Sequence, residues 1–154
     1  METLVMNRPT RNTLWGCLLV LILAEFYSCD ARAQERPFQF ITLDCLFRGQ
    51  LSTTIEQGKL ATTVPKDTLA ITLSNFDYDK HTAMMIGNAG SDEVSFIPSQ
   101  KKAVLVQFSK TGNGFMTSVS EPIGGKAIAF HSRHSWLFGE PIISEYQADC
   151  KVRK

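Results

Sequence analysis

The chain has 154 residues, enough for one ordinary domain and too few for two. Its 16 lysines and arginines oppose 15 aspartates and glutamates, so the formal net charge is +1. This balance argues against a nucleic-acid binder, which needs a basic face to neutralise phosphates. Hydrophobic residues make up 44% and charged residues 20% of the chain, a composition that predicts a folded domain and argues against wholesale disorder.

The first 33 residues have the pattern of a secretory signal peptide. Arg8 and Arg11 precede an apolar run, Leu14–Ala24, and Ala31-Arg32-Ala33 supplies the small residues of a cleavage site. The run is too short to span a bilayer, which takes about 20 residues. We therefore expect cleavage after Ala33, a mature domain of residues 34–154 and a periplasmic or secreted location. An uncleaved N-terminal membrane anchor is the alternative.

Two cysteines, Cys45 and Cys150, remain in the expected mature chain. In an exported domain, two thiols without a second ligand at close spacing favour a disulfide over a metal site. The bond would close a loop of roughly 100 residues and contribute about 4–5 kcal/mol on a chain-entropy estimate. We predict the disulfide Cys45–Cys150, with two buried free thiols as the alternative.

Alternation of apolar and polar residues predicts a strand near each end of the mature chain. One apolar face near the start carries Ile41, Leu43, Cys45 and Phe47. Its counterpart near the end carries Tyr146, Ala148, Cys150 and Val152. Because a strand has a side-chain period of two, each cysteine falls on the apolar face of its strand. The first and last strands can therefore be neighbours joined through the core.

Six further strands are predicted between these two, separated by short turns rich in glycine, aspartate, asparagine and proline: Thr68–Phe76, His81–Ile86, Glu93–Ile97, Ala103–Ser109, Phe115–Ser120 and Lys126–Ser132. The stretch Leu51–Val64 is either a loop or one weak strand. No window shows sustained helical periodicity. Links this short cannot make parallel crossovers, so the strands should form an antiparallel meander.

The predicted fold class is therefore all-β. We expect an up-and-down barrel of eight strands, or nine if Leu51–Val64 contributes one, similar in outline to lipocalin-like folds. An even strand count makes the first and last strands antiparallel neighbours, which explains the Cys45–Cys150 link. A two-sheet β-sandwich is the alternative.

Segments of the mature chain resemble a group of uncharacterised small exported bacterial proteins. They are Met84–Gly90 (MMIGNAG), His131–His134 (HSRH) and Glu145–Cys150. The resemblance covers most of the mature chain and implies export from a bacterial cell. It implies no activity and no substrate.

Residues with catalytic or ligating chemistry are few. His131 and His134 lie three apart, so on a strand they would face opposite ways and could not share a metal ion. Ser132 lies in no Gly-x-Ser-x-Gly turn, which argues against a hydrolase. Asp77 and Asp79 fit a hairpin turn better than a calcium loop. We expect no enzyme activity, no metal and no cofactor.

Apolar side chains supply the candidate binding surfaces. Those expected inside the barrel, as packed core or as the lining of a cavity for one small ligand, are Phe40, Phe76, Phe96, Phe108, Phe115, Phe130, Met84 and Met85. Trp136, Leu137 and Phe138 form an apolar cluster in an expected loop bounded by Gly139 and Pro141. His131 and Arg133 share a strand face and together could bind an anionic headgroup or a carboxylate.

Together these features favour a monomeric, non-enzymatic binding module for a small apolar or amphipathic ligand. Trp136–Phe138 would lie near the mouth of the barrel, and His131 or Arg133 would meet the polar end of the ligand. The alternative is an interaction or inhibitor domain of the bacterial envelope, anchored to a partner protein by the Trp136 cluster. Neither a nucleic-acid partner nor a membrane span after signal cleavage is expected.

Overall fold

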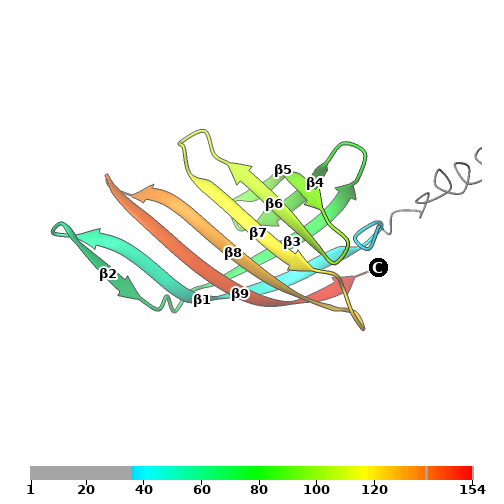
Figure 1. Cartoon of the computed structure of the whole chain (residues 1–154), viewed down its shortest axis with the longest axis horizontal. Helices are drawn as coiled ribbons and strands as arrows, with labels where there is room; N and C mark the ends of the chain where they lie inside the picture. The colour runs from blue at the N-terminus through cyan, green and yellow to red at the C-terminus, as the bar shows by residue number, and fades with distance from the viewer. Residues whose placement is uncertain (1–35, 138, 154) are drawn as a thin grey trace, which may run out of the picture. The chain divides into compact units, whose positions relative to one another are not determined.

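The computed structural model describes residues 36–137 and 139–153, most of which lie in strands (Figure 1). In chain order the strands are β1 (Thr42–Glu56), β2 (Lys59–Thr63), β3 (Thr68–Asp77), β4 (Thr82–Gly87), β5 (Gly90–Pro98), β6 (Lys102–Phe108), β7 (Gly114–Ser120), β8 (Lys126–Leu137) and β9 (Glu140–Arg153). The expected signal peptide, residues 1–33, lies outside the described residues.

Eight of the strands close into an antiparallel barrel. Each strand from β3 to β9 pairs with the next, and β9 pairs with β1, which also pairs with β3. The ninth strand, β2, lies outside this ring and pairs with the second half of β1. The prediction of an eight-stranded up-and-down barrel is therefore confirmed, and the structure is not a sandwich. The uncertain stretch Leu51–Val64 forms the end of β1 together with β2.

The predicted disulfide Cys45–Cys150 is present and closes the barrel at its seam. The two cysteines are directly opposed in the β1–β9 register, with Cα atoms 4.1 Å apart, and both are buried. Such a bond indicates an oxidising, extracytoplasmic environment. Within the described ranges, no helix has the length and apolar character needed to cross a bilayer.

Strands β1, β8 and β9 run well past the barrel and form an arm with β2 (Figure 1). The arm comprises residues 51–63, 135–137 and 140–144, and its strand order is β2-β1-β9-β8. The prediction of a loop around Trp136 is therefore wrong, because Trp136 pairs with Pro141 and Leu137 pairs with Glu140 in a β-hairpin. Gly139 has a φ of 86°, a conformation that suits glycine in a tight hairpin turn.

A β-bulge between Gly49 and Leu51 changes which side chains of β1 face the interior. Before the bulge the odd-numbered residues face inward. After it, Ser52 lies opposite the inward Ser144, and the two hydroxyl oxygens are 3.0 Å apart. Gly49 also allows the β2–β3 connection to pack closely, because an added Cβ would lie 2.6 Å from the Cβ of Pro65.

The barrel end that holds the chain start and the β3–β4, β5–β6 and β7–β8 turns is filled by aromatic side chains; we call it the closed end. Phe38 is fully buried there although it precedes the first strand, and its backbone N–H donates to Tyr78 Oη at 3.1 Å. Phe76, Phe96 and Tyr78 complete the cluster, with ring centroids 5.0 to 6.3 Å apart. These four rings form the packed core at that end of the barrel.

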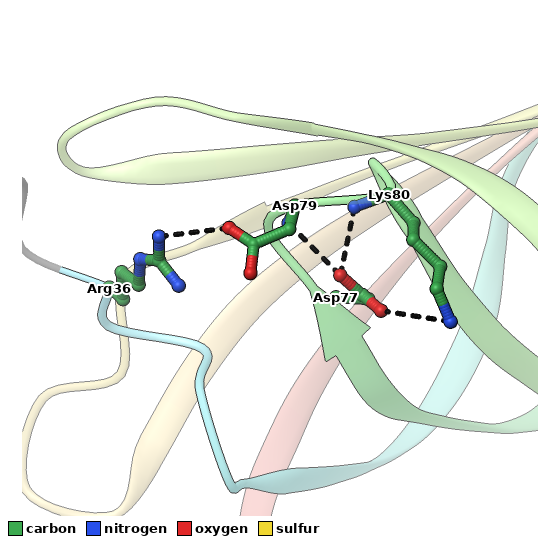
Figure 2. Close-up of polar contacts among 4 residues, drawn as sticks. All are labelled: Arg36, Asp77, Asp79 and Lys80. Carbon is green, nitrogen blue, oxygen red and sulfur yellow. Dashed lines mark hydrogen bonds and ion pairs between the residues drawn. The ribbon is translucent and has the colours of Figure 1, made fainter.

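The β3–β4 turn fastens the N-terminal segment over the closed end (Figure 2). Asp77 Oδ1 accepts the backbone N–H groups of Lys80 and Asp79, at 2.8 and 2.9 Å. The hydrogen bond from Lys80 is the main reason that the pKa of Asp77 is lowered from 3.8. Asp79 pairs with Arg36 at 3.0 Å. The interpretation of these aspartates as turn residues is confirmed.

Three of the aromatic residues expected inside are instead exposed: Phe40, Phe108 and Phe130. Phe130 lies between the inward Ala129 and His131, so it must face outward. Phe108 faces outward for the same reason at the end of β6, and Phe40 precedes β1. Phe76, Phe96 and Met85 are buried as expected, whereas Met84 and Phe115 are half-buried.

Candidate ligand-binding cavity at the open end of the barrel

The opposite end of the barrel, from which the arm extends, contains a cavity of about 470 Å³. This is within the usual range for small-molecule sites, about 300–1,000 Å³. Its wall includes Ile71 of β3, Met85 of β4 and Phe115 of β7, together with the β4–β5 turn around Asn88. His131 and Arg133 of β8 supply polar groups on one side. We call this end the open end.

His131 is buried and held by a hydrogen bond across the β7–β8 pair. Thr117 is its direct partner in the register, and Thr117 Oγ1 lies 2.8 Å from His131 Nδ1. If Nδ1 carried the hydrogen, the buried Thr117 hydroxyl would have no acceptor among the described residues. We therefore assign the hydroxyl as donor and Nδ1 as acceptor, which places the ring hydrogen on Nε2.

The Nε2 of His131 is not fully enclosed by the protein. The hydrogen bond of His131 within the described part of the chain is made by Nδ1. Every fully buried side-chain nitrogen or oxygen atom in that part has a partner, so Nε2 must retain some accessible surface. His131 is among the residues that line the cavity, and its Nε2–H is the group available to donate to a ligand oxygen there.

The imidazole of His131 is uncharged near neutral pH. Burial lowers its pKa to about 4, and the positive charge of Arg133 adds to this effect. The ring is also fixed in position by aromatic neighbours. Its centroid lies 5.6 Å from that of Phe47, 6.2 Å from that of Tyr146 and 6.3 Å from that of Phe115.

Arg133 supplies a positive charge beside this neutral donor. Its guanidinium carbon lies 5.9 Å from the centroid of the Phe115 ring, its cross-strand partner. No carboxylate of the described residues lies within 4.0 Å of it. Arg133 is half-buried at the cavity, and among the described residues no carboxylate pairs with its guanidinium.

The structure separates the site residues expected from the sequence into two groups. His131 and Arg133 share a face, as predicted, and both line the cavity. Trp136 is on the opposite face of β8, 65% exposed, so its expected place at the mouth is wrong. Leu137 lies in β8, and Phe138 lies outside the described residues.

Two contributors to the site were missed in the sequence. Thr117 orients His131 through its hydrogen bond. The sequence did contain a signal for it, because Thr117 is a polar residue between Phe115 and Val119 on the inward face of a strand. The β4–β5 turn around Asn88 forms part of the wall, and no local pattern predicts that a turn lies over a cavity. The sequence matches no protein-family model and no curated protein.

Proposed function

We propose that this protein is an exported, non-enzymatic module that binds one small amphipathic molecule in the open-end cavity. The observation that carries the proposal is that an uncharged, buried His131 and Arg133, which has no carboxylate partner among the described residues, line the same cavity. If this space served only to complete the packed core, apolar side chains would be expected at the positions of His131 and Arg133. Two hydrogen-bond donors in one cavity wall, one of them charged, favour a ligand with an oxygen-rich, negatively charged end.

The rest of the cavity favours an apolar ligand body. Ile71, Met85 and Phe115 offer aliphatic and aromatic surface, and burial of apolar area stabilises a complex by about 25 cal/mol per Å². A carboxylate at the other end would accept hydrogen bonds from His131 Nε2 and from Arg133, and charge-assisted bonds of this kind are the stronger ones. The ligand class that fits is a medium-chain amphipathic carboxylate.

Binding without catalysis fits the chemistry of His131. A general base works best when its pKa lies near the working pH, and burial holds the pKa of His131 at about 4. Its Nδ1 is already engaged by Thr117. The imidazole therefore serves as a fixed donor to the ligand rather than as a proton carrier.

The same proposal includes export through a cleaved signal peptide and residence in the periplasm or outside the cell. Support comes from the basic start, the apolar run Leu14–Ala24 and the small residues of a cleavage site that ends at Ala33. The disulfide Cys45–Cys150 also supports export. Mass spectrometry of the full chain after export in a bacterial host tests this part. The expected mass is that of residues 34–154 with one disulfide.

Calorimetric titration with decanoate and with decanol tests the ligand class. We expect decanoate to bind the protein and Arg133→Gln to weaken that binding about tenfold, the effect of losing about 1.4 kcal/mol. Arg48→Gln is the matched control, because Arg48 is exposed on β1 and does not line the cavity. Decanol should bind wild type and Arg133→Gln alike. Equal decanoate binding by both arginine variants would rule out the proposed recognition.

A second candidate function is favoured by the outer face of the arm. Trp136, Pro141, Ile55 and Leu60 follow one another across its strands, since Trp136 pairs with Pro141 and Ile55 pairs with Leu60. Trp136 and Leu60 are largely exposed. Such an apolar row suits contact with an envelope protein, as the alternative reading of the sequence proposed. Capture of one partner by wild type and its loss with Trp136→Ala would support this function.

A further inference from the structure

The loops around the closed end form one continuous surface, which we call the basic rim. It comprises residues 40–42, 98–102, 121–126 and 151–153. The Glu121 N–H donates to the Lys101 carbonyl at 2.7 Å, and the Val152 N–H donates to the Gly125 carbonyl at 2.9 Å. Thr42 lies opposite Arg153 in the β1–β9 register. The four segments are therefore neighbours in space at the end where the described chain begins (Figure 1).

Two large apolar side chains project from the basic rim. Phe40 is 90% exposed and Ile123 is 80% exposed, the highest values among the large hydrophobic residues that the structure describes. Phe40 also has a φ of 60°, a region that bulky side chains rarely occupy. Neither side chain is buried in the isolated domain. Both are placed to enter an apolar phase outside the protein.

Four lysines lie on the same rim. Lys101, Lys102, Lys126 and Lys151 are exposed, and in the described part of the chain none lies within 4.0 Å of a carboxylate. Arg153 forms an ion pair with Asp44 at 3.4 Å. Within the four segments of the rim, Glu121 is the acidic residue. The rim therefore carries an excess of positive charge, although the whole chain is nearly neutral.

Lys126 and Lys151 are directly opposed on β8 and β9. Their side chains face outward, because the next pair in the register, Ala127 and Cys150, is buried. Like charges directly opposite each other on a sheet destabilise it. Asp44 is the partner of Lys151 on the other side, in the β1–β9 register, but no carboxylate of the described residues lies within 4.0 Å of either lysine. An anion bound across the two ammonium groups would reduce their repulsion.

A membrane surface is one source of such an anion. Anionic phospholipid headgroups present phosphates at that surface, and exposed lysines are attracted to them.

We propose that the basic rim docks on the surface of an anionic phospholipid bilayer. Phe40 and Ile123 enter the boundary between headgroups and acyl chains, and the four lysines contact lipid phosphates. Attraction of lysines to an anionic surface and burial of apolar side chains are the two contributions that hold a protein on a membrane. In this orientation the open-end cavity, on the opposite end of the barrel, is not covered by the membrane. The inference does not depend on the proposed ligand.

Vesicle co-sedimentation of the full chain tests the proposal. Vesicles of phosphatidylcholine alone are compared with vesicles that also contain phosphatidylglycerol. We expect tighter binding to the anionic vesicles, weakened by added salt. The quadruple variant Lys101→Gln, Lys102→Gln, Lys126→Gln and Lys151→Gln should reduce partitioning to them about tenfold or more. Any contribution of residues 1–33 is common to wild type and to all variants, so the comparison between variants isolates the lysines of the rim.

A charge-matched control distinguishes the rim from net charge. Arg48→Gln, Lys59→Gln, Lys66→Gln and Lys110→Gln remove the same charge from exposed sites elsewhere, and should change partitioning by less than about twofold. Equal loss in both quadruple variants overturns the proposal. So does equal binding of wild type to the two vesicle compositions. Circular dichroism of each variant is the control measurement for an intact barrel.

Quenching of tryptophan by brominated phosphatidylcholine in the anionic vesicles tests the orientation. The chain has 2 tryptophans, Trp15 and Trp136, so Trp15→Phe leaves the one on the arm. We expect little quenching of that variant and strong quenching after Ile123→Trp is added. Quenching of Trp136 equal to that at position 123 overturns docking through the rim.

Discussion

Thr117 and His131 lie directly opposite each other on β7 and β8, and a 2.8 Å hydrogen bond joins their side chains inside the barrel. This bond sets which nitrogen of His131 carries the ring hydrogen. It also satisfies two polar groups that the barrel has removed from water. The stability of the domain and the donor offered to a ligand are therefore linked at one pair of residues.

Removal of the Thr117 hydroxyl tests this link. Thr117→Val keeps the side-chain shape but leaves His131 Nδ1 buried without a donor, which should lower the free energy of unfolding by about 1–3 kcal/mol. Urea unfolding followed by circular dichroism measures the change. Thr53→Val is the control, because Thr53 is bonded to Thr62 in an exposed pair on the arm. A variant at 117 as stable as the control would contradict the assignment.

The lowered pKa of His131 predicts how stability depends on pH. The folded pKa of about 4 is below the model value of 6.5, so the unfolded chain binds more protons between these values. Stability is therefore full above pH 6.5 and falls as pH decreases toward 4, by on the order of 3 kcal/mol in total. The pKa of Asp77 is lowered from 3.8, so its effect begins below that window.

Urea unfolding between pH 7 and pH 4 measures this dependence. In His131→Gln, which cannot titrate, the loss over this range should be smaller than in wild type. His134→Gln is the matched control, since His134 is exposed on the outer face of the same strand. Parallel pH profiles for wild type and His131→Gln would show that His131 is not the group responsible.

The disulfide Cys45–Cys150 should account for a large share of stability. It joins residues 105 apart in sequence, and loss of a native disulfide from a small exported domain costs about 2–5 kcal/mol. The double variant Cys45→Ala and Cys150→Ala should therefore have a much lower urea midpoint. Cys17→Ser with Cys29→Ser, outside the expected mature domain, should leave the midpoint unchanged. Equal midpoints for the two double variants would contradict this role.

Close packing at the bulge predicts the effect of a single methyl group. In Gly49→Ala the new Cβ would lie 2.6 Å from both the Cβ and the carbonyl oxygen of Pro65, so the β2–β3 connection must shift. We expect a loss of about 1–3 kcal/mol. Gly87→Ala is the control, because a Cβ at Gly87 meets no atom within 4 Å. Thermal unfolding of both variants measures the difference, and equal melting temperatures would be the contrary result.

Much of the barrel was predictable because strand alternation is a local property. The inward sets of the first and last barrel strands, each containing one cysteine, could be read residue by residue. The prediction is wrong where an aromatic residue is assigned to the core because of its residue type and not because of its position in the alternation. Phe130 and Phe108 are exposed because their immediate neighbours already face inward.

The arm could not be predicted because its signals resemble those of a loop. Gly139 and Pro141 flank the turn of the β8–β9 hairpin and are common in loops as well. The bulge at Gly49–Leu51 shifts the inward set of β1 by one residue, and that shift depends on pairing with β9. Trp136 was therefore expected at the mouth, whereas it lies on the outer face of the arm.

The sequence by itself determined the strands, their antiparallel order, the cysteine pair and the shared face of His131 and Arg133, since each depends on spacing along the chain. Only the tertiary structure decided that His131 is buried against Thr117, that Arg133 has no carboxylate beside it among the described residues, and that the lysines around Ile123 gather on one rim. These properties arise from the register between strands and from barrel closure, which bring together residues distant in sequence.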